Sequence, residues 1–310
     1  MRGMLALALV LLAGLWGGFP GARAQGRSCG IYMKPLRQAM KSGDLATAAR
    51  QLEAAQGSHA CSGEQLARMG RMAAYAAMRA AFAPGVRGQA REDLLRRGLR
   101  LGRPWQLLAA LGDILEARKE HAAAARYYQE ALDDINDAQL NPRPPKRAVI
   151  GSIYRKAMIA RKLARGFVPT TRGRSGEPGG LARLATRGFV VRKTVVPIAF
   201  KTGSVAFTAD GAKAAADMLD FLNRQGAPDI TLVGHTDERG PKGYNMRLSL
   251  ARAKAVREWM KARGYEGKIR VEGRGEEEPF DLGDEDPSDY TREEIWQLNR
   301  RVELKLDDEG

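Results

Sequence analysis

The chain has 310 residues, of which 44% are hydrophobic and 28% are charged, and it carries a formal net charge of +15 at pH 7. This composition is typical of folded, water-soluble domains and excludes a disordered chain, and the length suits two domains with separate cores. Residues 191–310 hold 20 Lys and Arg against 23 Asp and Glu, a net charge of −3, so that residues 1–190 carry +18. The basic excess therefore belongs to the N-terminal part, where it indicates either an anionic partner or a solvated arginine-rich surface.

Residues 1–24 have the pattern of a secretory signal peptide. Arg2 precedes an apolar run over residues 5–15, and Ala22-Arg23-Ala24 forms a small-x-small cleavage site. The run is short for a bilayer span, which favours cleavage over an uncleaved N-terminal anchor. Since no Cys stands at the cleavage point and no later stretch is long and apolar enough to cross a membrane, we expect a soluble periplasmic protein. Export argues against nucleic acid and leaves acidic lipids, wall polymers and acidic proteins as anionic partners.

Residues 25–165 are rich in Ala, Leu, Arg and Met and predict a series of helices. Residues 43–55 and 119–132 share an order of small, large and small side chains that resembles the second helix of a tetratricopeptide repeat, and their offset equals about two repeats of roughly 34 residues. The middle unit, residues 64–102, fits poorly because a Pro-Gly pair interrupts it. We predict about three helix pairs and a final helix over residues 147–165, which together bind a protein partner. An ordinary helical bundle is the alternative.

The two cysteines, Cys29 and Cys61, lie in the part expected to be exported, where an oxidising compartment permits a disulfide. In the repeat interpretation, Cys29 opens the first helix and Cys61 follows the second, and antiparallel helices bring these ends together. The predicted disulfide would stabilise the fold by roughly 3–4 kcal/mol in the chain-entropy model. Two unpaired thiols are the alternative.

Residues 166–193 are rich in Gly, Pro and Arg and read as a flexible basic linker. The sequence pattern changes after residue 193. Segments of strand-forming residues then alternate with segments whose apolar residues have helical spacing, as in an α/β sandwich. The expected strands lie at residues 195–200, 230–233, 269–271 and 302–306, and the expected helices lie around residues 215–222 and over 246–263.

Three stretches in this last part have a specific order and spacing. They are Gly234-His235-Thr236-Asp237 with Gly240; Tyr244-Asn245 with Leu248-Ser249-Leu250-Ala251-Arg252-Ala253; and Gly273, Gly275 and Pro279 with Asn299-Arg300-Arg301-Val302-Glu303. Together with Phe200 and the Gly203-Ser204 turn, they resemble the OmpA C-terminal-like family over residues 194–307. The resemblance implies a mixed sheet with helices on one face, so the whole chain is expected to be an α+β multidomain protein with an all-α N-terminal part.

The resemblance also implies non-catalytic binding of peptidoglycan through the diaminopimelate of its stem peptide. The family's two dominant positions correspond to Asp237 and Arg252, and their chemistry fits a head group that carries an ammonium and a carboxylate on one carbon. A turn-capping Asp and a surface Arg are the plain alternatives. Asn245 either touches the ligand, braces the loop or caps the helix before Met246. The remaining motif residues are expected to be structural: Gly234, Thr236, Gly240, Asn299, Arg300 and Arg301.

Other chemistry has little support in the sequence. Three His and two distant Cys give no metal-site spacing, and we expect His235 to pack rather than bind metal. No cofactor-binding loop is recognised. The acidic residues over 276–289 lack the spacing of a calcium loop, which favours a solvated loop. The expected protein is a periplasmic adaptor associated with the cell wall or outer membrane; the rivals are a wall-processing enzyme, a scaffold with an inactive wall site and an outer-membrane-bound anchor.

Overall fold

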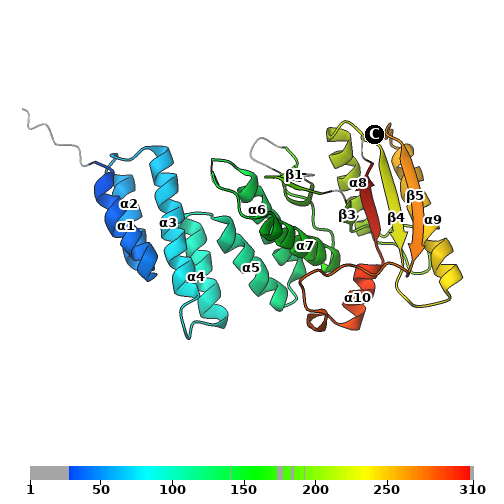
Figure 1. The fold of residues 1–310 in the computed structure, drawn as a ribbon, viewed down its shortest axis with the longest axis horizontal. Helices are drawn as coiled ribbons and strands as arrows, with labels where there is room; N and C mark the ends of the chain where they lie inside the picture. Colours follow the sequence, from blue (N-terminus) through cyan, green and yellow to red (C-terminus); the bar gives the residue numbers. More distant parts are fainter. Residues whose placement is uncertain (1–27, 140, 173–176, 183–184, 192, 308–310) are drawn as a thin grey trace, which may run out of the picture.

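The computed structural model describes residues 28–307 except 140, 173–176, 183–184 and 192. The predicted signal peptide lies outside these residues. Figure 1 shows two parts along the long axis of the molecule, a row of helices followed by a sheet with its own helices. In the described part of the chain, no helix has the length and apolar character needed to cross a membrane.

Within the described residues, the first part consists of seven helices, which confirms the prediction of an all-helical region. Pro84 and Gly85 lie between the third and fourth helices, so the Pro-Gly pair that disturbs the middle repeat is a turn between two helices. Membership of the tetratricopeptide repeats stays a prediction. The helices are α1 (Gly30–Ser42), α2 (Leu45–Gly57), α3 (Gly63–Ala81), α4 (Gly88–Leu101), α5 (Trp105–Ala117), α6 (His121–Asn136) and α7 (Arg147–Leu163).

Small residues allow these helices to approach closely. A Cβ atom built on Gly112 of α5 would lie 2.5 Å from the ring of Tyr128 on α6, so the ring fills the space that a larger residue would need. The Tyr128 hydroxyl donates a hydrogen bond of 2.8 Å to Asp113. This buried tyrosine therefore fixes the register between the two helices.

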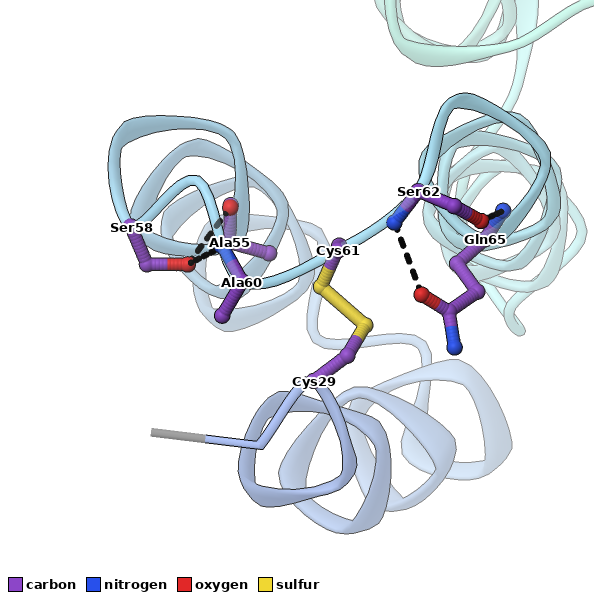
Figure 2. Close-up of a disulfide and its surroundings, with 7 residues drawn as sticks. All are labelled: Cys29, Ala55, Ser58, Ala60, Cys61, Ser62 and Gln65. Carbon is purple, nitrogen blue, oxygen red and sulfur yellow. Dashed lines mark hydrogen bonds between the residues drawn. A yellow bond between two sulfur atoms is a disulfide. The ribbon is translucent and has the colours of Figure 1, made fainter. Parts of the chain in front are cut away.

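The predicted disulfide joins Cys29 and Cys61, whose Cα atoms are 4.9 Å apart. Figure 2 shows that it links the start of α1 to the segment between α2 and α3. Ser62 follows immediately and caps α3, because its side chain accepts from the Gln65 amide while the Gln65 side chain accepts from the Ser62 amide. The disulfide and the capping box thus fix one end of the first three helices.

The second part is built on a four-stranded mixed sheet with the order β3-β6-β4-β5. β4 and β5 are parallel, whereas β6 is antiparallel to both of its neighbours, β3 and β4. This arrangement confirms the predicted mixed sheet packed with helices. The elements are β3 (Lys193–Val196), α8 (Ala209–Arg224), β4 (Ile230–His235), α9 (Lys242–Lys261), β5 (Ile269–Gly275), α10 (Arg292–Asn299) and β6 (Val302–Leu306).

Alternation along the strands places the core on one face of the sheet. Ile230, Leu232 and Leu304 belong to one apolar cluster with residues of α8 and α9. The intervening Thr231, His235 and Glu303 point to the other face, as expected for side chains with a period of two. The strand β3 ends at Val196, short of the predicted limit at Phe200, because the following Pro197 has no amide to donate to a neighbouring strand.

The segment between the two parts packs against both. It contains η1 (Gly180–Ala182), β1 (Ala185–Thr186) and β2 (Phe189–Val190), and β1 and β2 form a small antiparallel sheet. Val168 and Leu181 are buried in the cluster that surrounds α6 and α7. The predicted flexibility of residues 166–193 concerns motion and stays a prediction.

Candidate functional site

Asp237 lies just beyond the end of β4. The amide of Thr236 donates a hydrogen bond of 2.7 Å to the carbonyl oxygen of Gly275 on the neighbouring strand, which fixes the chain as it leaves the sheet. Gly240, in the loop that follows, has a φ of 103°, a conformation that favours glycine. The loop therefore turns back toward α9 and leaves Asp237 at the end of the strand.

Arg252 is brought toward Asp237 because α9 lies unusually close to the sheet. A Cβ atom on Gly234 would lie 2.1 Å from the carbonyl oxygen of Ser249, and one on Gly273 would lie 2.8 Å from the Ser249 hydroxyl. That hydroxyl accepts a hydrogen bond of 2.9 Å from the Gly275 amide. Glycines on β4 and β5 thus allow the helix to approach the strands, and the helix carries Arg252 to the strand ends.

The guanidinium of Arg252 is held in place by two residues of the segment before α8. Its centre lies 4.9 Å from the centroid of the Phe200 ring, and its Nε donates a hydrogen bond of 3.1 Å to the carbonyl oxygen of Ser204. Its two Nη groups make no hydrogen bond or ion pair to any described residue. Arg252 is therefore oriented by Phe200 and Ser204, while the end of its guanidinium stays available to a ligand.

Asp237 is charged and already has cationic neighbours. Arg239 Nη2 lies 2.7 Å and Arg300 Nη1 lies 2.6 Å from its Oδ2 atom. Burial alone would raise the pKa of Asp237, but hydrogen bonds from Arg239 and Arg300 outweigh it and hold the pKa below the ordinary value. The carboxylate is thus an anion at neutral pH, although one side of it is shared with two arginines.

Asp237 and Arg252 line the same cavity, whose volume is about 770 Å³. Asp237 and Arg252 are each only 6% exposed, so both charges are largely shielded from bulk water. The cavity is bounded by α9, by the segment that contains Phe200 and by the last turn of α7. The two residues predicted to act together therefore share one concave site, and the helical part of the chain forms one of its walls.

Asn245 braces this site from within α9. Its Nδ2 group lies 3.2 Å from the carbonyl oxygens of Asp237 and Arg239 and 2.5 Å from the Glu276 carboxylate. The alternative of a helix cap is wrong, because α9 begins at Lys242 after Pro241 and Asn245 is inside its first turn. Asn245 also lines the cavity, so its brace and its predicted ligand contact are compatible.

The two arginines before β6 have different surroundings. Arg300 reaches Asp237 in the cavity, whereas Arg301 is buried and its Nε lies 2.8 Å from Glu303. Glu303 also has Lys193 at 2.7 Å and His235 Nε2 at 3.3 Å. His235 is thus packed beneath the site among polar groups, as predicted.

Asn299 anchors the neighbouring acidic loop, because its Oδ1 atom accepts a hydrogen bond of 2.8 Å from the Phe280 amide. Most residues of the loop over 276–289 are exposed, but Phe280 and Leu282 pack with Leu163 of α7. Most of the loop is therefore solvated, as expected, while its two apolar residues pack on the helical part. Within the described residues, no group of three or more His, Cys, Asp or Glu is placed to hold a metal ion.

Sequence reasoning missed the contributions of Arg239 and Lys162 to the cavity. Arg239 stands two residues after Asp237, and a cation so near a predicted anion is a signal that could have been used. Lys162 lies on α7, in a different part of the chain, and nothing in its local sequence links it to Asp237. Only the packing of α7 against the sheet part brings it to the cavity.

Known proteins resemble the second part of the chain. The peptidoglycan-associated lipoprotein of Pseudomonas aeruginosa is 40% identical over 77 residues, which cover 24% of this chain and 42% of that protein. The protein of the same name from Brucella melitensis is 32% identical over 114 residues, which cover 36% of this chain and 64% of that protein. The chain thus covers less than two thirds of each relative.

Solved structures are similar over the same region. The crystal structure of the peptidoglycan-associated lipoprotein from Burkholderia pseudomallei is 26% identical, with a TM-score of 0.30; the similarity covers 41% of this chain and 92% of that one. Residues 199–292, which contain both Asp237 and Arg252, match the model of the OmpA family.

Proposed function

We propose that the cavity lined by Asp237 and Arg252 binds peptidoglycan through the diaminopimelate of its stem peptide. The observation that carries this proposal is the presence of two opposite, largely buried charges in one cavity, within the segment that matches the OmpA family. The free head of diaminopimelate carries an ammonium and a carboxylate on one carbon. Asp237 would accept from the ammonium, and the two Nη groups of Arg252 would donate in parallel to the carboxylate.

The strength of such contacts suits an anchor. A hydrogen bond to a charged group contributes about 1.5–3 kcal/mol when it is well formed. Two such contacts give reversible binding, and a wall polymer offers the same head group at many places. The names of the relatives, which are peptidoglycan-associated lipoproteins, support association with the wall.

The helical part of the anchored protein would then bind a protein partner in the periplasm, near the cell wall or outer membrane. A second cavity of about 310 Å³ lies between α5, α6 and α7, and Trp105, Val149 and Ile153 contribute to its lining. Val149 is 37% exposed although it is apolar. This concave, partly apolar surface supports the predicted partner binding, since helical arrays commonly bind partners on such surfaces.

Co-sedimentation with purified diaminopimelate-type peptidoglycan tests the proposal. The chain from Gln25 should pellet with the wall, whereas Asp237→Ala and Arg252→Ala should stay in solution. Asp220→Ala on α8 and Arg247→Ala on α9 remove exposed charges of the same kinds and should pellet like the natural chain. Circular dichroism checks that every variant is folded. Equal pelleting of all five proteins would show that the two charges do not bind the wall.

Two further measurements separate the alternatives. Peptidoglycan with lysine in place of diaminopimelate lacks the second carboxylate-bearing head, so the chain should sediment with it less. Soluble fragments released from the wall during incubation would support the enzyme alternative. A natural chain that stays in solution with either wall would support a scaffold with an inactive wall site.

A further inference from the structure

The last turn of α7 carries three consecutive buried residues that point to three different places. Arg161 Nη2 lies 2.6 Å from the Asp217 carboxylate on α8, and Leu163 packs with Leu298 of α10. Lys162, between them, lines the cavity that holds Asp237 and Arg252. Its own carbonyl oxygen accepts a hydrogen bond of 2.8 Å from Gln297. Contacts on both sides therefore fix the position from which Lys162 enters the cavity.

Lys162 has no anionic partner there. It is 7% exposed, and among the described residues no acceptor lies within hydrogen-bond or ion-pair distance of its ammonium group. Lysine is almost never so buried unless it is paired. Burial, together with the charges of Arg300, Arg301 and Arg252, lowers the pKa of Lys162 to about 7. Lys162 is thus an unpaired amine in the wall of the cavity, and its charged form is destabilised there.

The cavity has more cations than the zwitterion of the proposed function requires. That ligand would pair its ammonium with Asp237 and its carboxylate with Arg252, which leaves Lys162 without an anion. In a stem peptide that ends at diaminopimelate, this residue has one free ammonium but two free carboxylates, because its other amine is acylated by the preceding residue. The second carboxylate is an anion, which is the partner that Lys162 lacks.

We propose that Lys162 is a binding residue that pairs with this second, C-terminal carboxylate of the stem peptide. The inference rests on the proposed function and extends the site beyond the segment that matches the OmpA family, since Lys162 belongs to the helical part. The helical part then completes the wall-binding site and makes it selective for stems with a free C-terminal carboxylate.

Calorimetry with two synthetic peptides tests this inference. One peptide is L-Ala-γ-D-Glu-meso-diaminopimelate with a free C-terminal carboxylate, and the other is the same peptide amidated at that carboxyl. The chain from Gln25 should bind the free acid about tenfold or more tightly than the amide, as expected for one lost charged contact. Lys162→Met should bind both peptides with the affinity that the natural chain has for the amidated peptide. Lys146→Met, which removes an exposed lysine next to the start of α7, should keep the preference.

The outcomes separate this inference from the proposed function. If Lys162→Met is folded and keeps the preference, or if the natural chain binds both peptides equally, Lys162 does not read the carboxylate while the proposed function stands. If the natural chain binds neither peptide, both proposals fail. Lys162→Arg, which retains a cation, should keep most of the preference.

The pH dependence of the natural chain supplies a readout that does not depend on the folding of a variant. Because Lys162 is protonated only below its pKa, the preference for the free acid should be larger near about pH 6 than near about pH 8.5. Carboxylates and guanidinium groups keep their charge across this range. The groups of these kinds that surround Lys162 or line the same cavity are Arg161, Asp210, Asp237, Arg239, Arg252, Arg300 and Arg301. A preference that is constant across this range would overturn the inference.

Discussion

A Cβ atom placed on Gly234 would lie 2.1 Å from the carbonyl oxygen of Ser249, so β4 and α9 leave no room for a side chain between their backbones at this point. The relationship sets the distance between Asp237, which follows β4, and Arg252, which belongs to α9. Gly234→Ala should therefore push the helix from the sheet and lower the free energy of unfolding by about 1–3 kcal/mol.

Thermal unfolding followed by circular dichroism checks this expectation. Gly243→Ala is the matched control, because its Cβ atom would meet only the end of the Arg247 side chain at 3.6 Å. If both variants unfold at the temperature of the natural chain, the close approach of helix and sheet is not needed.

In the proposed function, Arg239 competes with the ligand for Asp237. Its guanidinium lies 2.7 Å from the carboxylate, and its side chain is 56% exposed. Exposed ion pairs are weak, so Arg239→Ala should strengthen binding to diaminopimelate-containing peptides only modestly, by up to about fivefold. Calorimetry measures the change, with Arg247→Ala as the control. Weaker binding of Arg239→Ala would mean that Arg239 contacts the ligand directly.

His121 couples α6 to α10 in a manner that depends on pH. Its Nδ1 lies 3.0 Å from Glu116 and its Nε2 lies 3.1 Å from Glu294. Burial lowers the pKa of His121, but the two carboxylates outweigh this effect and raise it above the ordinary value. The protonated ring therefore stabilises the fold fully below the unfolded pKa of about 6.5, and this contribution is lost as the pH rises through the raised pKa.

The variant His121→Gln tests this coupling. The natural chain should have the higher unfolding temperature near about pH 6, and the difference should shrink as the pH rises toward about 8.5. A difference that does not change with pH would show that packing, and not the charge of His121, stabilises the contact.

Reduction of the disulfide between Cys29 and Cys61 should loosen the first three helices and leave the proposed wall-binding site intact. The expected loss is roughly 3–4 kcal/mol in the free energy of unfolding. Thermal unfolding with and without a reductant measures it, and wall co-sedimentation under the same reducing conditions should be unchanged. Loss of sedimentation below the unfolding temperature would show that the cavity depends on the first three helices.

Much of the fold follows from local patterns. Alternating apolar residues predict β4, β5 and β6, and glycines at the motif positions coincide with the closest contacts between α9 and the sheet. The helix α10 was not predicted because only Leu298 and Asn299 of its residues are buried, so its apolar periodicity is weak. Its capping box of Thr291 and Glu294 was the available signal.

The candidate site could be predicted only in part. Asp237 and Arg252 lie in local sequence motifs, so both could be predicted from the sequence. Lys162 reaches the cavity through tertiary packing, because Leu163 docks on Leu298 and Arg161 pairs with Asp217. Such contacts depend on the arrangement of two distant parts of the chain, which a local sequence pattern does not encode.

The central claim is that Asp237 and Arg252 bind opposite charges of one diaminopimelate head. The most direct measurement compares co-sedimentation with untreated peptidoglycan and with peptidoglycan whose free amines have been acetylated, which removes the ammonium and leaves the carboxylate. Acetylation should reduce binding of the natural chain to the level of Asp237→Ala and should not reduce binding of that variant further. Equal binding of the natural chain to both walls would contradict the claim.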